Sequence, residues 1–304
     1  MATTAAYRGD FMDYVDIAGM KLSRIILGTD GYSERIDEKT APKLMETYVS
    51  MGGNVIDTAR SYCGGKSEEL VGRFVQGKRD KIIISTKCAH PPADNMKHSR
   101  LDRESIEADI DASLKALGTD YIDIIWLHRD DVSLPVMPII DTLNLMKKKG
   151  KVRFFGASNW TYDRIAEANS YAAESGQEGF FASQALYNLA TRTRVWDETL
   201  VCVEGEEKKK YEVGKLPLFA FSSQAKGFFE KYDEGTLSEK AKDRYLNEAS
   251  IEMYKKIKES AEKSGDTISH AALKMLVESS GFEVFPIIGP SNVYQLKATF
   301  GIKA

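Results

Sequence analysis

The chain has 304 residues, of which 42% are hydrophobic and 29% are charged, and its formal net charge is -3. This composition is ordinary for a globular protein, and the small negative charge argues against a nucleic-acid partner or an anionic membrane surface. The three cysteines show no CxxC spacing, which argues against a disulfide framework and a metal site. No segment has the roughly 20 consecutive apolar residues of a membrane span. The first 14 residues lack the apolar core of a signal peptide, so we expect a cytoplasmic protein.

Short apolar runs alternate with longer segments of helical period along the chain. The runs that we interpret as strands are 24–27, 54–56, 81–84, 121–127, 152–155, 179–182, 216–220 and 284–288. Helices are predicted over 40–51, 67–77, 102–118, 139–149, 162–175, 195–210, 248–263 and 269–279. Near-continuous apolar strands that alternate with helices are typical of a parallel sheet, and eight of them predict a single α/β domain over residues 1–304, a (β/α)8 TIM barrel.

Two segments lie outside these repeats. Residues 14–23 have the pattern of a β-hairpin that turns at Ala18-Gly19, and we expect this N-terminal β-hairpin to close the floor of the barrel. Residues 228–247 form a polar insert after the seventh strand, and we interpret them as a mobile loop over the site.

Polar residues follow the predicted strands at the end where barrel enzymes carry their active sites. Asp57 and Tyr62 follow the second strand, Lys87 the third and His128 the fourth. Because adjacent strands end side by side, a salt bridge between Lys87 and Asp57 is expected, and the ammonium would lower the pKa of the Tyr62 phenol. Such a phenol can act as general acid to a carbonyl oxygen, while His128 donates a second hydrogen bond to it.

The set Asp57, Tyr62, Lys87 and His128, within NVIDTARSY, IIISTK and IIWLHRDD, resembles the catalytic tetrad of the aldo-keto reductase superfamily. The resemblance covers roughly residues 14–299. It implies an NAD(P)H-dependent oxidoreductase that reduces aldehydes or ketones, sugar-derived ones included, to alcohols or catalyses the reverse, by hydride transfer with Tyr62 as general acid. The GxGxxG fingerprint of the usual dinucleotide-binding domain does not follow any predicted strand.

The resemblance also implies cofactor-binding residues at other strand ends. Ser158, Asn159 and Gln184 would hold the nicotinamide carboxamide, and Phe221 would stack on the ring in place of the usual Tyr. The full implied set is Thr29, Ser158, Asn159, Gln184, Phe221, Ser222, Gln224, Gly227, Gly289, Ser291 and Gln295. NADPH is the cofactor that family habit favours. NADH stays open, because Gln295, Ala298 and Thr299 stand where relatives often carry a phosphate clamp and adenine-binding residues.

The substrate is expected to be a small carbonyl compound or alcohol, and the default oligomeric state is a monomer. Tyr32, Arg129 and Trp160 lie at or near strand ends, where lining a substrate pocket and packing in the core are equally open. The remaining histidines, His90, His98 and His270, are interpreted as loop or surface residues.

Two other functions stay open beside the reductase. A strand-end lysine such as Lys87 suits an enzyme that forms a Schiff base with its substrate. A non-catalytic sensor that retains its cofactor, like the potassium-channel β subunits of the same fold, is the other alternative. The intact set of catalytic residues argues against that sensor.

Overall fold

The structure is a computed structural model that describes residues 12–92, 94–96 and 98–303, so most of the segment tested for a signal peptide lies outside the described residues. The strands are β1 (Tyr14–Ile17), β2 (Met20–Ser23), β3 (Ile26–Gly28), β4 (Val55–Asp57), β5 (Ile83–Cys88), β6 (Ile122–Leu127), β7 (Val152–Ser158), β8 (Ser183–Leu186), β9 (Leu218–Phe221) and β10 (Val284–Ile288). The α-helices are α1 (Thr40–Ser50), α2 (Lys66–Val75), α3 (Arg103–Leu117), α4 (Met137–Lys148), α5 (Tyr162–Glu174), α6 (Gly205–Gly214), α7 (Phe228–Asp233), α8 (Glu239–Tyr245), α9 (Glu248–Ser264), α10 (Ile268–Glu278) and α11 (Val293–Thr299).

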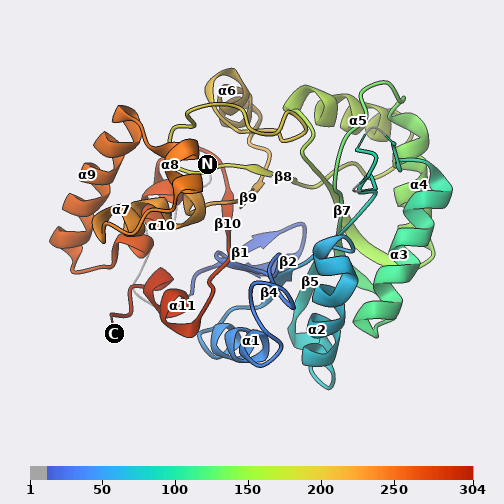
Figure 1. Ribbon diagram of the computed structural model, residues 1–304. Coiled ribbons are helices and arrows are strands. Elements are labelled where there is room, and N and C mark those ends of the chain that lie inside the picture. Colours follow the sequence, from blue (N-terminus) through green and yellow to red (C-terminus); the bar gives the residue numbers. More distant parts are fainter. Residues whose placement is uncertain (1–11, 93, 97, 304) are drawn as a thin grey trace.

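Strands β3 to β10 close into a parallel barrel in the order β10-β3-β4-β5-β6-β7-β8-β9, with helices around it (Figure 1), as the sequence predicts. The strand expected over 179–182 is displaced, because β8 begins only at Ser183. Strand β6 illustrates why five of its six residues are apolar, the exception being Asp123, which is buried and paired with Arg79 and Arg153. Ile124 and Trp126 pack inside the barrel, whereas Ile125 and Leu127 pack in the layer between strands and outer helices. A parallel strand covered on both faces has no solvated side, so alternation with polar residues is lost.

The predicted N-terminal hairpin is confirmed, and it packs against the amino ends of the barrel strands. Leu22 is fully buried in the cluster of side chains that fills the barrel, and Val15, Ile17 and Met20 pack against that cluster. The side chain of Asn54, directly before β4, accepts from the Ser23 N–H at 2.7 Å and donates to the Lys21 carbonyl at 2.8 Å. The hairpin therefore covers the floor of the barrel, opposite the strand ends that carry the site.

The helix predicted over 195–210 is confirmed over 205–210 but wrong over 195–204, because α6 begins only at Gly205. In the preceding segment the Asp197 carboxylate accepts from the N–H and the hydroxyl of Thr199, at 2.9 and 2.6 Å. Cys202 forms a β-bridge with Leu186 at the end of β8. Local side-chain bonds of this kind compete with helical hydrogen bonds, and the bridge holds the chain extended.

The interpretation of residues 228–247 as a loop is also wrong, since they form the short helices α7 and α8. Both lie beside α9 and α10 (Figure 1). Phe228, Phe229 and Tyr245 are buried there in one cluster with Ile257 of α9 and Ala271 of α10. These three aromatic residues anchor a segment whose overall composition is polar.

Among the described residues, no helix combines the length and the apolar character needed to cross a membrane.

Candidate active site

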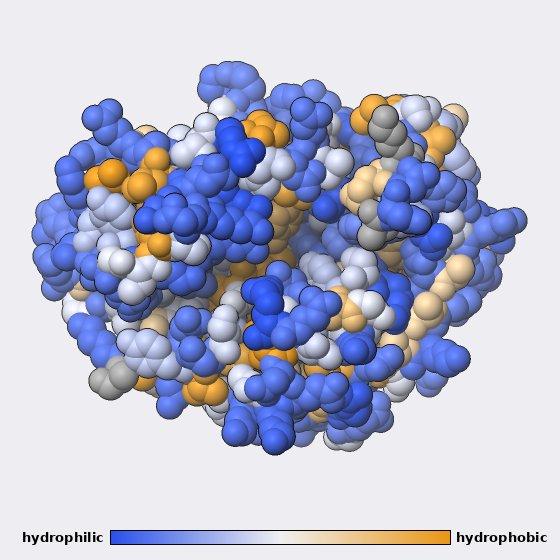
Figure 2. All heavy atoms as spheres, in the orientation of Figure 1, coloured by the Kyte–Doolittle hydropathy of each residue, from blue (hydrophilic) through white to orange (hydrophobic). Residues whose placement is uncertain are grey.

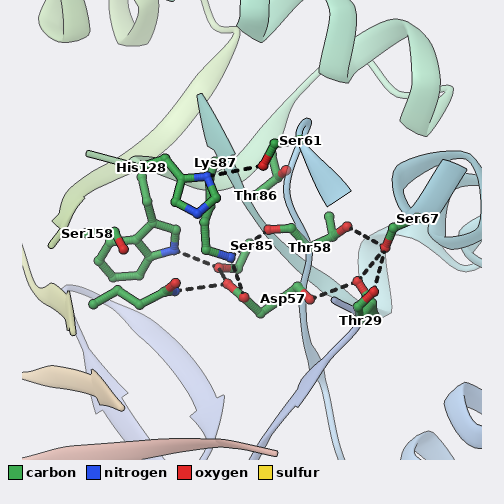
Figure 3. A network of polar contacts seen from close by, with 12 residues as sticks. Thr29, Asp57, Thr58, Ser61, Ser67, Ser85, Thr86, Lys87, His128 and Ser158 are labelled. Atoms are coloured by element: carbon green, nitrogen blue, oxygen red, sulfur yellow. Dashed lines mark hydrogen bonds and ion pairs between the residues drawn. The ribbon is translucent and has the colours of Figure 1, made fainter. Parts of the chain in front are cut away.

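A buried ion pair between Asp57 and Lys87 lies at the centre of the polar network in Figure 3, and it confirms the predicted salt bridge. The Lys87 ammonium lies 2.5 Å from Asp57 Oδ2 and donates to the Thr58 carbonyl at 2.8 Å. The other oxygen of Asp57 accepts from the Ser85 hydroxyl at 2.7 Å and from the Gln184 amide at 3.0 Å. Each oxygen of the carboxylate thus has a partner, which offsets the cost of burying a charge.

Tyr62 begins a tight turn five residues after the end of β4, and this turn brings its ring to Lys87. The Lys87 ammonium lies 4.7 Å from the centroid of the Tyr62 ring. The turn requires positive φ at Cys63, Gly64 and Gly65, with values of 50°, 63° and 92°. Burial raises the pKa of the Tyr62 phenol, and the charge of Lys87 lowers it by less, so the net shift is upward. The expected net lowering of this pKa is therefore wrong, because burial outweighs the nearby charge.

His128 directly follows β6, and its side chain lies near Tyr62 and Lys87. Its backbone N–H donates to the Cys88 carbonyl at 2.9 Å, and its ring centroid lies 6.0 Å from that of Tyr62. Burial lowers the pKa of His128 well below its ordinary value, and the charges of Lys87 and Arg129 add to this. The imidazole is therefore neutral at physiological pH and can donate a hydrogen bond without carrying charge.

These side chains line a cavity of about 510 Å³ at the mouth of the barrel. Figure 2 shows the face hollowed near its centre, with hydrophilic residues around the hollow. The lining residues are Arg60, Ser61, Tyr62, Lys87, Cys88, His90, Pro91, Pro92, Arg100, Asp109, His128 and Arg129.

His90 lies in a loop, within the interpretation of it as a loop or surface residue, but sequence reasoning missed that it lines the cavity. Its ring meets that of His128 edge to face, with centroids 4.6 Å apart, and its Nδ1 lies 2.6 Å from the Pro91 carbonyl oxygen. The signal was its position two residues after β5, since the loops at the carboxyl ends of barrel strands build the site. His98 is exposed as expected, whereas His270 is buried in α10 and paired with Asp266 at 2.8 Å.

The residues implied to hold the nicotinamide carboxamide lie together beside the ion pair. Ser158 and Gln184 are register partners on β7 and β8, and both are buried. Asn159 has φ 60°, and its amide nitrogen donates to the His128 carbonyl and to the Ser158 hydroxyl, both at 3.1 Å. Its Oδ1 is buried and has no hydrogen-bond partner among the residues that the structure describes.

Thr29, also expected to bind cofactor, directly follows β3 and is fully buried. Its hydroxyl donates to the Asp57 carbonyl at 3.0 Å and lies 2.8 Å from the Ser67 hydroxyl (Figure 3). These contacts position the backbone at the end of β4.

The remaining residues of the implied cofactor set lie after β9 and β10. Phe221 ends β9 with a half-buried ring, and φ is positive at Ser222, Ala225, Lys226 and Gly227. The Gln224 amide donates to the Thr299 hydroxyl at 3.3 Å, which links this segment to α11. After β10, Gly289 leads to Ser291, whose N–H donates to the side chain of Gln295 at 2.8 Å.

Of the three residues considered for a substrate pocket, Arg129 lines the cavity, whereas Tyr32 and Trp160 do not. The side chains of Tyr32 and Trp160 are both fully buried in the core beneath the outer helices. Trp160 donates to the Arg129 carbonyl at 3.3 Å, so it supports the chain behind the cavity. Tyr32 and Trp160 therefore pack in the core and do not line this cavity.

The chain is similar to known proteins over most of its length. The model of the Aldo/keto reductase family matches residues 24–303. The chain is 28% identical to norsolorinic acid reductase B of Dothistroma septosporum over 293 residues, 90% of this chain and 72% of that protein. It is 29% identical to the uncharacterized oxidoreductase YrpG of Bacillus subtilis over 297 residues, 94% of this chain and 89% of that protein. It is 31% identical to a probable voltage-gated potassium channel subunit beta of Arabidopsis thaliana over 188 residues, 60% of this chain and 57% of that protein. A family match over most of a closed parallel barrel shows that the chain belongs to the aldo/keto reductase family, a family of oxidoreductase enzymes.

Proposed function

We propose that the protein reduces aldehydes or ketones to alcohols, or catalyses the reverse oxidation, with NADPH or NADH as the hydride carrier and Tyr62 as the proton donor. The observation that supports this most directly is the meeting of Tyr62, Lys87 and His128 on one cavity wall, with Lys87 held by Asp57. A proton donor, a cation and a neutral hydrogen-bond donor around one space suit a carbonyl oxygen that becomes an alkoxide.

The strand ends beside this cavity fit a nicotinamide group. A carboxamide has both a donor and an acceptor, and the buried Asn159 Oδ1 is an acceptor that lacks a partner among the described residues. Ser158 lies directly beside it, and Phe221 offers a half-buried aromatic face at the end of β9. When bound, the reduced nicotinamide would supply the hydride, and these residues would hold it.

The proton comes from the phenol of Tyr62. As the carbonyl oxygen gains negative charge, the phenol transfers its proton and the alcohol is complete. Burial lowers the pKa of Lys87, but the charges of Asp57 and Tyr62 outweigh this and the net shift is upward. Lys87 therefore stays an ammonium and stabilises the phenolate that the transfer leaves behind.

His128 orients the carbonyl. Its Nδ1 lies 3.5 Å from the Ser61 hydroxyl (Figure 3). When that hydroxyl donates to Nδ1, the hydrogen of the neutral ring is on Nε2, where it can bond the carbonyl oxygen. The ring meets His90 at its edge, which limits its rotation.

Of the two cofactors we propose NADPH. Gln295 is engaged in its own segment, because its side chain accepts from the Ser291 N–H and its backbone N–H donates to the Asn292 side chain. Lys226 and Lys297 are exposed in the two segments implied to bind the cofactor, and neither has an ion-pair partner among the described residues. These are the cations available there for a 2'-phosphate.

The test is the consumption of NADPH and of NADH with a reactive aromatic aldehyde, for wild type and Tyr62→Phe. Loss of the general acid should lower kcat by about 10²–10⁴-fold. Tyr14→Phe is the matched control, because it removes a hydroxyl that donates to the Gly52 carbonyl at 2.5 Å on the floor side. Equal rates for wild type and Tyr62→Phe would show that Tyr62 is not the acid. Faster turnover with NADH would overturn the choice of NADPH.

A cofactor-binding sensor is the second candidate function, favoured by the similarity to the probable potassium channel subunit beta. It predicts that cofactor binds while a broad panel of carbonyl compounds is not reduced. The Schiff-base alternative is disfavoured, since Lys87 is held as an ammonium by Asp57 and the Thr58 carbonyl and so lacks a free electron pair. If borohydride traps a substrate adduct in the absence of nicotinamide, the Schiff-base mechanism is supported instead.

A further inference from the structure

The cations that line the cavity are not equally neutralised. Arg60, Lys87, Arg100 and Arg129 all contribute to its wall. Three of them form ion pairs: Arg60 with Glu68, Lys87 with Asp57 and Arg100 with Asp109. Arg129 forms no ion pair with any residue that the structure describes, because no carboxylate there lies within 4.0 Å of its guanidinium. The lining therefore carries one surplus positive charge, and it lies at Arg129.

The guanidinium of Arg129 is also only partly hydrogen-bonded. Its Nη1 donates to the His128 carbonyl at 2.9 Å. Its Nε–H is buried and has no acceptor among the described residues. Burial lowers the pKa of Arg129, opposed by the charges of Asp197 and Tyr62, but a guanidinium keeps its proton at physiological pH. A charged donor group in this state favours a ligand that brings an anionic acceptor.

Asp197 is the acidic residue that acts most strongly on Arg129, but it does not take the place of an anionic ligand. Asp197 attracts the guanidinium only from beyond ion-pairing distance. Its carboxylate already accepts two hydrogen bonds from Thr199, at 2.9 and 2.6 Å. These bonds hold it in its own turn of the segment before α6.

We propose that Arg129 binds a carboxylate of the substrate, so that the enzyme prefers aldehydes or ketones that also carry a carboxylate. The inference rests on the proposed function for the position of the carbonyl, between Tyr62 and His128. Arg129 directly follows His128, and Tyr62 also acts on its charge, so the carbonyl and the carboxylate lie close together in one small molecule. One surplus charge matches a carboxylate monoanion rather than a phosphate dianion, and the planar fork of arginine suits carboxylate geometry.

The test compares two aldehydes of similar shape, 4-carboxybenzaldehyde and methyl 4-formylbenzoate, as the ratio of their kcat/KM values at saturating cofactor. Wild type should favour the acid. Arg129→Gln should reduce the ratio by roughly tenfold or more, the loss expected for a hydrogen bond to a charged group. Arg129→Lys, which keeps the charge without the fork, should retain part of the preference. The matched control is Arg73→Gln, which removes an exposed arginine of α2 paired with Glu38 at 3.3 Å and should keep the wild-type ratio.

Calorimetric binding of benzoate and of benzamide to the protein with cofactor gives a readout that does not need turnover. Benzoate should bind more tightly than benzamide, and Arg129→Gln should remove the difference. If wild type reduces neither aldehyde but binds benzoate through Arg129, the proposed function fails and the carboxylate site stands. If the two aldehydes react and Arg129→Gln changes neither the ratio nor benzoate binding, the carboxylate site fails and the reductase stands. Should the Gln variant not fold, an unchanged ratio in Arg129→Lys together with no benzoate preference in wild type overturns the inference.

Discussion

The two sides of the barrel mouth are held by different kinds of interaction. At the ends of β4 and β5, buried bonds join residues far apart in the chain, such as Gln184 and Asp57, which are 127 positions apart. After β10, by contrast, the side chains of Gln295, Asn292 and Thr299 form local bonds, such as that of the Ser291 N–H to the side chain of Gln295, four positions on. The barrel itself therefore positions the groups proposed to react, whereas short-range chain geometry shapes the segment after β10 that is proposed to hold part of the cofactor.

This difference matches what each side is proposed to do. Proton transfer requires groups held within fractions of an ångström, and a buried network with each oxygen of Asp57 partnered meets that need. A large cofactor must enter and leave, and exposed segments with local bonds can open at low cost. Three variants or conditions test whether the two sides differ in this way.

The largest expected effect is on stability at the buried ion pair. Lys87→Met leaves the Asp57 carboxylate buried without its cation, and the free energy of unfolding in urea should fall by about 3–5 kcal/mol. Lys209→Met is the matched control, because Lys209 pairs with Glu206 at 2.6 Å on the surface. That exposed pair should contribute at most about 1 kcal/mol. Similar small losses in both variants would contradict the view that buried charge holds this side.

An intermediate effect is expected at the helix caps. Asn292 caps α11 in a segment proposed to bind cofactor, and Asn247 caps α9, outside those segments; each side chain accepts from an N–H at 2.9 Å. Replacing either with Ala should cost about 1 kcal/mol of unfolding free energy. Fluorescence titration with NADPH should show weaker binding for Asn292→Ala only. Equal affinity in the two variants would show that the local geometry of this segment is not needed for the cofactor.

The smallest effect is expected from pH. Reduction needs the Tyr62 phenol protonated and the His128 imidazole neutral. Burial raises the pKa of Tyr62 above its ordinary value of 10.0, so the phenol keeps its proton to higher pH. Burial moves the pKa of His128 well below 6.5, so the ring stays neutral as pH falls to that value. The kcat/KM for aldehyde reduction should thus be flat from pH 6.5 to 9 and fall only above 10. A midpoint below pH 9 would mean that Lys87 outweighs burial at Tyr62.

The barrel and the grouping of the candidate site residues at its mouth could be predicted from sequence because both depend on simple rules. Parallel strands covered on both faces are continuously apolar, and a residue at the carboxyl end of such a strand lies at the mouth. Asp57, Lys87 and His128 are identified in this way, and the ion pair between the first two follows from adjacent strands.

What could not be predicted depends on contacts between loops or on a balance of opposing terms. The position of His90 against His128 depends on how the loop after β5 folds back. The net pKa shift of Tyr62 depends on whether the effect of burial or that of the Lys87 charge is larger. The sequence does not show how deeply the phenol is buried. The absent helix over 195–204 reflects Asp197 bonding to Thr199 and Cys202 bridging to β8, neither of which hydrophobic periodicity reveals.

The hairpin of β1 and β2 has a consequence for the order of events during turnover. Leu22 and its neighbours cover an interior that is already filled by Trp126, Phe219 and Phe285, so in the described part of the chain the site is reached from the mouth only. Two ligands that share a single entrance cannot be exchanged independently, because the shallower one blocks the path of the deeper one. The deeper ligand must arrive first and depart last. The packed interior and the hairpin that covers it, remote from the atoms proposed to react, would in this way impose an ordered kinetic sequence.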